Sequence, residues 1–294
     1  MEKKILTFKT KIALATAILF WSSAFVGIRI GLTSYSPGGL ALLRFLVASI
    51  CMGIIYKFLP HRAILSRKDL ILLILFGALG LGCYNVFLNY GEISVSAGIA
   101  SFIISQSPLL TLLCSIIFLQ EKFNLGILVG ILVSILGVGL ITLGHHEHTL
   151  QLNLGLIYLF LAALVSGLYS ILQKPFLNKY PIVDVTVFIV WGATLFLLIY
   201  TPNLIADIKT ASLSATLAGI YLGIFPAAIA AVAWSYALAH MPASLCATFL
   251  YFMPVFATVL GWFCLGEVPA LLSLLGGVIA LLGVWVANKA FLKG

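Results

Sequence analysis

The chain is divided along almost its whole length into apolar stretches that are long enough to cross a membrane. A membrane-spanning helix needs about 20 mostly apolar residues, and short polar connectors separate such stretches here. Only 8% of the 294 residues are charged and 63% are hydrophobic, whereas soluble domains carry roughly 25% charged residues. A soluble globular protein is therefore excluded. We expect an all-α membrane protein of ten transmembrane helices, near residues 12–32, 38–58, 70–91, 95–118, 125–143, 155–177, 183–203, 213–237, 242–265 and 270–291.

The placement of the basic residues predicts the orientation of these spans. With the N-terminus in the cytoplasm, the outer connectors carry Lys209 alone. Lysine and arginine gather on cytoplasmic loops, so we expect a multi-pass protein of a bacterial inner membrane with both termini cytoplasmic. The net charge of +8 then reflects loop placement, and no nucleic-acid partner is expected. The predicted cytoplasmic side carries Lys3, Lys4, Lys9, Lys11, Lys57, Arg62, Arg67, Lys68, Lys122, Lys174, Lys179, Lys289 and Lys293.

An internal repeat relates the two halves of the chain. A shift of 146 residues superposes Pro108 on Pro254 and Glu121 on Glu267. The same shift pairs Gly77 with Gly223, Tyr90 with Tyr236, Ala97 with Ala243, Gly130 with Gly276, and Gly137 with Gly283. We therefore expect two five-helix repeats, residues 1–146 and 147–294, within one membrane unit. Because five is odd, the repeats are inverted, as in transporters whose substrate site lies near the midplane; chance recurrence of Gly and Pro is the alternative.

Several motifs resemble a known family. They are Phe20-Trp21-Ser22-Ser23-Ala24-Phe25 in the first span, Arg44 in the second, and a proline followed by a glutamate at the close of the fourth and ninth. With the two five-helix halves, they resemble the drug/metabolite transporter superfamily, specifically its EamA-type permeases, over essentially the whole chain. The resemblance implies a carrier for amino acids or similar metabolites, often an exporter.

Polar residues recur at helical spacing on single faces of the predicted spans. Asn85, Asn89 and Glu92 form such a stripe in the third span. Further stripes are Ser101, Ser105, Pro108, Thr111 and Ser115 in the fourth span, and Ser244, Thr248, Tyr251, Thr258 and Trp262 in the ninth. Polar groups that persist in a membrane usually face an internal cavity. Alternatively, serine and threonine bond their own preceding carbonyls or serve as small packing residues.

Aromatic and basic side chains complete the predicted substrate site. Trp21, Tyr84, Trp234 and Tyr251 lie deep in their spans, where they either contact a partly apolar ligand or pack helices. Arg29 and Arg44 either bind a substrate carboxylate, pair with Glu92, bond helix-end carbonyls, or extend to the interface. The candidate substrate-binding residues are Trp21, Ser22, Arg44, Tyr84, Asn85, Asn89, Ser101, Ser105, Gln106, Tyr169, Trp234, Thr248, Tyr251 and Phe252.

Acidic residues and histidines are restricted to connectors and span ends. A membrane enzyme needs a nucleophile with a base or a metal set, so we expect no catalytic residues, no cofactor and no enzyme. The pattern favours facilitated movement, exchange, or coupling through a group at the cavity edge. His145, His146 and His148 beside Glu147 form either a transition-metal site or a loop tip.

Prolines and glycines predict mechanical features. Pro108 and Pro254 should kink the fourth and ninth spans, and Pro226 should interrupt the eighth. Small-residue stripes suit close helix contact in a scaffold or a dimer, so a monomer or a homodimer is possible; they comprise Gly126, Gly130, Ser134 and Gly137, and Gly276, Ala280 and Gly283. The cysteines, Cys51, Cys83, Cys114, Cys246 and Cys264, lack metal-ligand spacing and are expected as free thiols.

The sequence thus predicts a secondary transporter that moves small organic metabolites across the inner membrane by alternating access. Its substrate site is expected between the first, third, fourth, sixth, eighth and ninth spans. We expect neutral or aromatic amino acids or related compounds, and export. The alternatives are a carrier of nucleotide-type or drug-like solutes, or a passive channel. The expected partners are a small-molecule substrate and membrane lipid.

Overall fold

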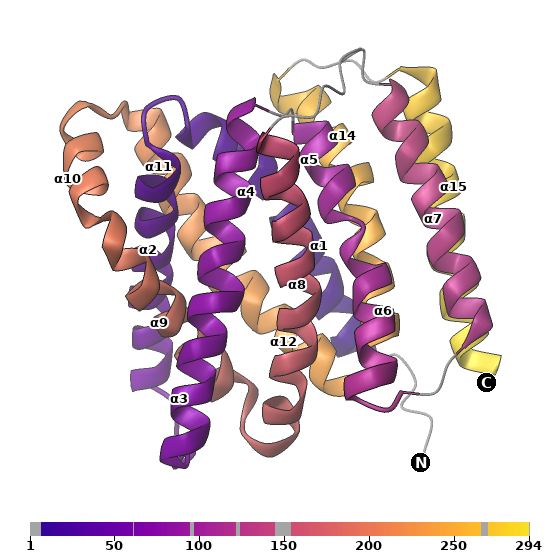
Figure 1. Ribbon diagram of the computed structural model, residues 1–294, viewed down its shortest axis with the longest axis horizontal. Coiled ribbons are helices and arrows are strands. Elements are labelled where there is room, and N and C mark those ends of the chain that lie inside the picture. Colours follow the sequence, from indigo (N-terminus) through magenta and orange to yellow (C-terminus); the bar gives the residue numbers. More distant parts are fainter. Residues whose placement is uncertain are drawn as a thin grey trace.

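The helices of the protein run side by side between two ends of a bundle (Figure 1). The structure is a computed structural model that describes residues 7–60, 62–94, 97–121, 124–144, 154–265 and 270–293. Regular structure in this part of the chain is helical, and no strand occurs in it. The expected all-α class is confirmed. Lys3, Lys4, His61, Lys122, the cluster at 145–148 and Glu267 lie outside the described residues.

The helices follow one another with short connectors. The α-helices are α1 (Phe8–Gly31), α2 (Pro37–Lys57), α3 (Arg67–Phe76), α4 (Cys83–Ser94), α5 (Ala97–Ile104), α6 (Ser107–Phe118), α7 (Leu125–Gly144), α8 (Leu154–Lys179), α9 (Ile182–Leu197), α10 (Thr201–Thr210), α11 (Leu213–Leu222), α12 (Ala230–His240), α13 (Ala243–Thr248), α14 (Phe252–Leu265) and α15 (Leu271–Lys293). Two π-helices, η1 (Gly77–Gly82) and η3 (Gly223–Ile229), and two 3-10 helices, η2 (Leu198–Tyr200) and η4 (Phe249–Tyr251), join some of them.

Seven helical stretches of the described residues are long and apolar enough to cross a membrane. They are Phe8–Gly31, Pro37–Lys57, Arg67–Ser94, Leu154–Lys179, Ile182–Thr210, Leu213–His240 and Ala243–Cys264. Ser107–Phe118, Leu125–Leu140 and Leu274–Ala287 are apolar but shorter. The structure therefore shows seven candidate spans, and the count of ten stays a prediction.

Serine side chains begin several of these helices. The Ser36 hydroxyl accepts the amide of Gly39 at 3.2 Å ahead of α2, and Ser66 and Ser212 do the same ahead of α3 and α11. Such caps satisfy an amide that has no partner inside the helix. Pro37 follows Ser36 directly, where its missing amide proton costs nothing.

Prolines interrupt the long helices where the sequence predicts. A proline cannot donate to the carbonyl four residues earlier, and its ring clashes with that carbonyl. α5 ends at Ile104, four residues before Pro108, and α11 ends at Leu222, four residues before Pro226 in η3. Ahead of Pro254 the helix tightens into η4. These breaks place irregular backbone in the middle of the bundle.

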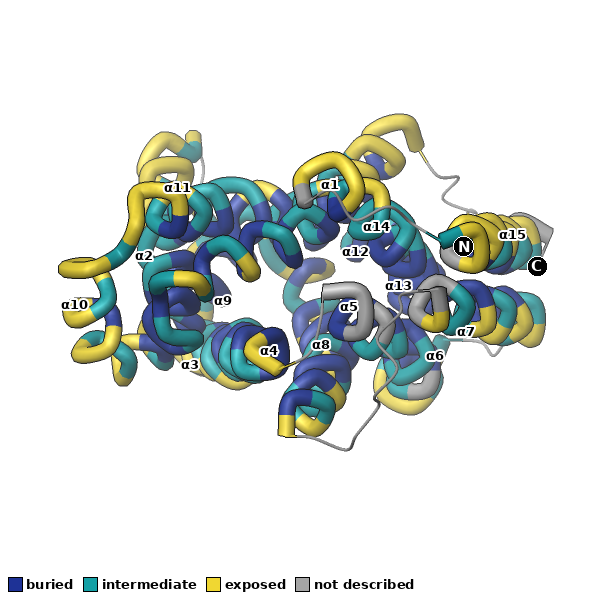
Figure 2. Tube along the Cα trace, turned by 90° about the horizontal axis from the view of Figure 1, so that it is seen from above, coloured by how far each residue is buried: buried dark blue, intermediate teal, exposed yellow. Residues whose placement is uncertain are grey.

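The predicted small-residue stripes pack against each other within the chain. A Cβ atom at Gly137 would lie 2.2 Å from the Ala280 nitrogen, and one at Gly130 would lie 2.6 Å from the Gly283 carbonyl oxygen. The Ser134 hydroxyl donates to the Ala280 carbonyl at 3.0 Å across the same contact. α7 and α15 thus form a close pair at one edge of the bundle (Figure 2).

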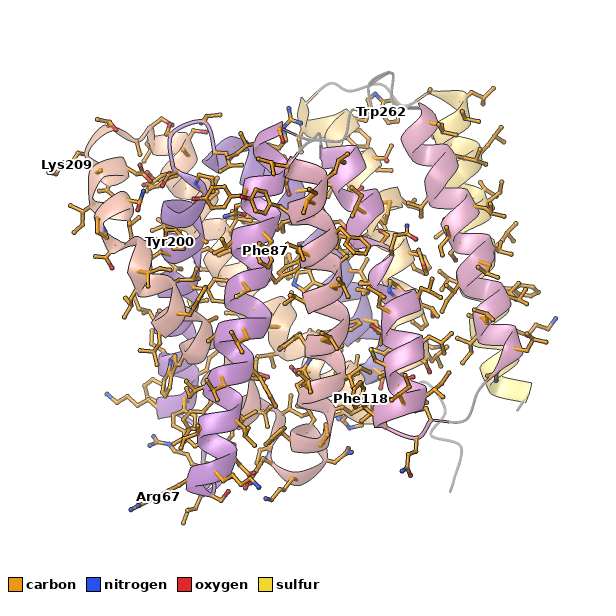
Figure 3. All side chains as sticks on the ribbon, in the orientation of Figure 1. Arg67, Phe87, Phe118, Tyr200, Lys209 and Trp262 are labelled. Carbon is orange, nitrogen blue, oxygen red and sulfur yellow. The ribbon has the colours of Figure 1, made fainter. Side chains whose placement is uncertain are left out.

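The two ends of the bundle differ in their residues. Arg67 and Phe118 lie at one end and Lys209 and Trp262 at the other (Figure 3). The end of α15 lies with Arg67 and Phe118 (Figure 1), and we call this end, marked by these two residues, the terminal end. Lys209 therefore lies opposite the terminal end, and its placement on the outer side of the membrane stays a prediction.

Candidate functional site

A cavity lies where the interrupted helices converge. About 880 Å³ of empty space, the open mouth included, lies within its walls. Its walls come from α1, α2, η1, α4, the α5–α6 break, α8, η3, α12, η4 and α14. The elements expected from the sequence all contribute, and α2 adds Arg44 and Phe45.

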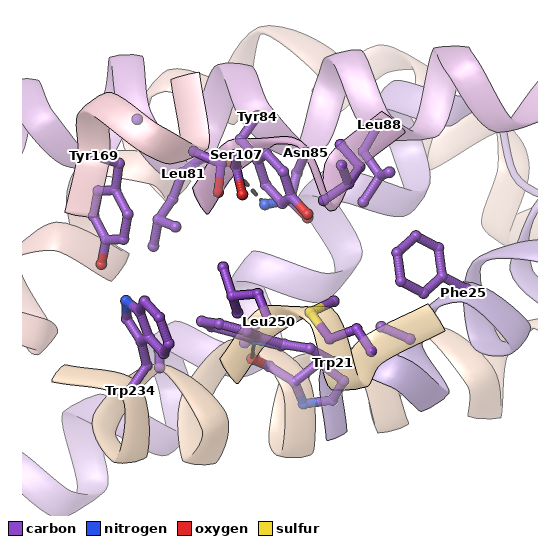
Figure 4. Close-up of a pocket in the computed structure, with 18 of the residues that line it drawn as sticks. Trp21, Phe25, Leu81, Tyr84, Asn85, Leu88, Ser107, Tyr169, Trp234 and Leu250 are labelled. Carbon is purple, nitrogen blue, oxygen red and sulfur yellow. Dashed lines mark hydrogen bonds between the residues drawn. The ribbon is translucent and has the colours of Figure 1, made fainter. Parts of the chain in front are cut away.

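One wall of the cavity is apolar and aromatic. The Trp21 and Trp234 rings are tilted against each other, with centroids 5.3 Å apart. The Trp21 indole donates to the Pro226 carbonyl at 3.0 Å, which anchors α1 on the irregular backbone of η3. Leu250 lies beside these two rings in Figure 4, and Phe25 continues the apolar surface.

The facing wall carries the polar groups. Tyr84, Asn85, Ser107 and Tyr169 lie across the cavity from Trp21 and Trp234 (Figure 4). Each contributes a hydroxyl or amide group to the lining. A space with apolar rings on one side and hydrogen-bonding groups on the other suits a small ligand with both kinds of surface.

Arg44 is the charged residue of the cavity lining. Its Nη1 donates to the Asn85 side-chain oxygen at 2.7 Å, and the Asn85 amide donates to the Leu81 carbonyl at 2.8 Å. The side chain is 5% exposed, and its Nε has no hydrogen-bond partner among the described residues. A buried donor without a partner is costly. Asn85 therefore holds the Arg44 guanidinium in the cavity lining, while its Nε is buried without a partner among the described residues.

Glycines bring the polar wall together. A Cβ atom at Gly80 would lie 2.9 Å from the Tyr169 ring, so only a glycine lets η1 approach α8 this closely. Gly77 approaches α9 in the same way, since its Cβ would lie 2.0 Å from the Ile189 carbonyl oxygen. The glycine-rich π-helix thus positions Tyr84 and Asn85, which follow it directly.

Glu92 is buried beyond the cavity, near the end of α4. It is 5% exposed, and neither carboxylate oxygen has a hydrogen-bond partner in the described part of the chain. Arg29 and Arg44 are the basic groups that act on it electrostatically. Arg29 itself is exposed in the last turn of α1. The sequence places Glu92 at a span end but does not predict this burial.

Half of the candidate residues from the sequence line the cavity. They are Trp21, Arg44, Tyr84, Asn85, Ser105, Tyr169 and Trp234. The structure places the remaining candidates, Ser22, Asn89, Ser101, Gln106, Thr248, Tyr251 and Phe252, away from this lining.

Backbone bonds account for several candidates. The hydroxyls of Ser22, Ser105 and Thr248 donate to the carbonyls of Ile18, Ser101 and Leu245 at 2.6 to 2.7 Å, and Asn89 donates to the Pro37 carbonyl at 2.9 Å. Tyr251 is fully buried in a separate apolar cluster with residues of α6, α7 and α15. The hydroxyls of Ser22, Ser105 and Thr248 thus bond to preceding backbone carbonyls, which is the alternative to cavity lining given above for serine and threonine.

Sequence reasoning missed other lining residues. Ser107 lies in the break before Pro108, and its hydroxyl has no partner among the described residues. Ser166 and Ser170 lie on either side of Tyr169 on α8 and could have been found from their spacing of four. Ala24, Phe25, Ile28, Leu88, Leu250 and Met253 carry no polar signal and are found only from the structure.

No group of three or more His, Cys, Asp or Glu side chains that could hold a metal occurs among the described residues. The histidines at 145, 146 and 148 lie outside them.

Comparison with known proteins decides the family. Residues 9–143 and again 153–289 match the EamA-like transporter family. The chain belongs to this family. The two matches cover nearly its whole length, so it carries two copies of the EamA unit, and it is a membrane transporter of the EamA type.

Individual EamA relatives extend over almost the entire chain. The chain is 36% identical to the uncharacterized transporter YdfC of Bacillus subtilis, over 97% of this chain and 92% of that protein. It is 37% identical to a probable terminal-alkyne amino-acid exporter of Streptantibioticus cattleyicolor, over 94% and 92%. A protein of known crystal structure is 20% identical, with a TM-score of 0.76 over 97% of this chain and 98% of that one, and shares the fold.

Proposed function

We propose that this EamA transporter is a secondary carrier for small organic metabolites, and that its substrates are neutral or aromatic amino acids or related compounds. The observation that carries this proposal is the pairing of Arg44 and Asn85 on one cavity wall with Trp21 and Trp234 on the other. A guanidinium in the cavity lining suits a carboxylate. The aromatic wall suits an apolar side chain.

The cavity chemistry also argues for this substrate class. Arg44 is the charged lining residue, so a multiply charged phosphate ester would find little compensation. The resemblance to a probable amino-acid exporter supports amino acids and the outward direction. We extend both to this chain as part of the proposal.

The proposed mechanism is alternating access between two inverted halves, residues 1–146 and 147–294, each with five spans. α5 with α6, α7 and α15 would supply the spans that complete the count of ten. Both termini would lie in the cytoplasm of a bacterial cell. The proline breaks in α5–α6, η3 and η4 lie against the cavity, which supports rearrangement of the halves around it.

Purified protein in liposomes tests the substrate class. A panel of labelled amino acids, nucleosides and organic cations is supplied with and without a pH gradient. We expect saturable uptake of neutral or aromatic amino acids, competed by their unlabelled forms. Uptake confined to nucleosides or cations, with none of the amino acids transported or competing, would contradict the proposal.

A further inference from the structure

A charged contact joins the two halves of the chain beyond the cavity, toward the terminal end. Glu121 follows α6, whose last residue, Phe118, lies at that end (Figure 3). One Glu121 oxygen accepts the Ala243 amide at 2.7 Å and the Lys174 ammonium at 3.2 Å. The other accepts the Ser244 hydroxyl at 2.6 Å and its amide at 3.3 Å. We name this contact of Glu121 with Lys174, Ala243 and Ser244 the inner latch.

Lys174 also bonds to the connector that leads into α13. Its ammonium donates to the Met241 carbonyl there at 2.8 Å. One glutamate from the first half therefore holds a lysine and two backbone amides of the second half. The other described ion pair, Lys179–Asp69, also joins the two halves at this end, from α8 to α3, but it does not reach α13.

The latch is connected to the cavity through two helices. On α8, Ser170 lines the cavity and Lys174 follows one turn later. Between them Gln173 is fully buried and accepts the Ser235 hydroxyl at 3.4 Å. On the other side, Cys246 is fully buried between Ser244 of the latch and Leu250 of the cavity wall. Buried side chains of α8 and α13 thus lie between the cavity and the latch.

The chemistry of the latch allows it to open. The Lys174 and Glu121 side chains are 14% and 16% exposed, so water can replace their bonds when they separate. Burial raises the pKa of Glu121, but Lys174, the Ser244 hydroxyl and the Ala243 amide lower it by more. The net pKa of Glu121 is therefore below its ordinary value. Glu121 is therefore ionised at neutral pH, and the latch is a charge pair.

We propose that the inner latch closes the cavity toward the terminal end and must break whenever the carrier opens to that side. This inference rests on the proposed alternating access. It assigns Glu121 a role in setting the access state, apart from substrate contact, because Glu121 is not part of the cavity lining.

Thiol labelling of Cys246 tests the latch without any substrate. Cys51, Cys83, Cys114 and Cys264 are replaced by serine in the full chain, which leaves Cys246 as the reporter. A membrane-impermeant maleimide is applied to spheroplasts and to inside-out vesicles. We expect Glu121→Gln to speed labelling at least about tenfold from the terminal-end side, since removing one partner of a partly buried pair shifts such an equilibrium by more than that.

The matched control is Lys179→Met, which breaks the other ion pair at the same end of α8. We expect it to leave the Cys246 labelling rate unchanged. An unchanged rate in folded Glu121→Gln, or an equal rise in Lys179→Met, would overturn the proposal. Faster labelling in Glu121→Gln alone, combined with no transport of any panel solute, would reject the substrate proposal and leave the latch standing.

A cross-link provides a second measurement if Glu121→Gln does not fold. Cysteines replace Glu121 and Ser244 in a background free of the native cysteines, and a short bis-methanethiosulfonate reagent joins them. We expect the cross-link to stop transport and a reducing agent to restore it. Full transport by the cross-linked protein would show that the latch need not open.

Discussion

Arg44 and Trp234 represent the two chemistries that the cavity brings together. Arg44 is buried, bonded to Asn85 and left with a free Nε among the described residues. Trp234 is 2% exposed and packs on Trp21 in the apolar wall of the cavity. Neither feature alone defines a substrate, because arginine also pairs with structural groups and tryptophan also packs helices. Together on facing walls they predict a solute with a carboxylate and an apolar part.

Replacing Arg44 tests the carboxylate half of this account. We expect Arg44→Ala to lower kcat/KM for transport by about 10- to 100-fold, the usual worth of a charge-assisted hydrogen bond. Arg44→Lys should restore only part of this, because an ammonium cannot donate in two directions from one plane. Arg67→Ala, at an exposed residue of the terminal end, is the control. Initial transport rates are compared at equal amounts of folded protein. Unchanged kinetics in Arg44→Ala would show that Arg44 does not bind the substrate carboxylate.

Replacing Trp234 tests the aromatic half. We expect Trp234→Ala to raise KM for aromatic substrates by about tenfold, and to raise it less for small substrates. A contact between two rings contributes roughly 0.5–1.5 kcal/mol of binding free energy beyond that of the buried area. Trp285, 56% exposed on α15, supplies the control Trp285→Ala. Competition assays with aromatic and aliphatic amino acids measure the preference. An equal loss for both classes would make Trp234 a packing residue.

At the scale of helices, the sequence indicates the breaks and close contacts better than it indicates which residues face the cavity. Pro108 and Pro226 end a helix four residues earlier, as the missing amide requires. Asn85 lines the cavity but Asn89, one turn later, bonds to Pro37. Both residues lie in the uninterrupted helix α4, and their spacing does not say where the cavity ends and where the same face packs on the start of α2.

η4 gives a physical reason why Tyr251 lies outside the cavity lining. Three residues per turn replace 3.6 in a 3-10 helix, so the face of the segment rotates at Phe249–Tyr251. Leu250 lines the cavity as a result, and Tyr251 is buried in the cluster with Leu112 and Ile131. The α-helical spacing used to read the sequence does not predict this, because it does not hold through the 3-10 turn ahead of Pro254.

The α7–α15 pair gives a stability prediction at this scale. We expect Gly137→Ala to cost about 1–3 kcal/mol, because the added Cβ would meet the Ala280 nitrogen at 2.2 Å. Gly277→Ala on α15 is the control, since its nearest neighbours are Val255 methyl carbons at 3.8 Å and alanine favours a helix. Thermal unfolding in detergent measures both. A Gly137→Ala protein as stable as Gly277→Ala would contradict the close packing.

The whole molecule is a two-unit EamA transporter, and its charges predict its orientation. Matches to the family over 9–143 and 153–289 agree with the repeat read from Pro108 and Pro254. The exact division of the chain and the number of spans remain predictions, because length and composition select seven helices among the described residues. What the sequence could not supply is the cavity itself, which depends on how distant helices meet.

Orientation can be measured with single cysteines in a background free of the native ones. We expect Lys209→Cys to react with an impermeant maleimide in spheroplasts, and Lys179→Cys to react only in inside-out vesicles. Lys209 lies opposite the terminal end (Figure 3), and Lys179 pairs with Asp69 near Arg67. Reaction of both cysteines from the same side would refute the predicted topology.

The central claim is that the cavity is exposed alternately to the two sides of the membrane. Counterflow in liposomes tests it most directly, with an accepted amino acid loaded inside and a trace of its labelled form outside. The account predicts saturable entry of label that is faster in loaded than in empty liposomes. Label entry that is linear in concentration and indifferent to the internal solute would contradict it.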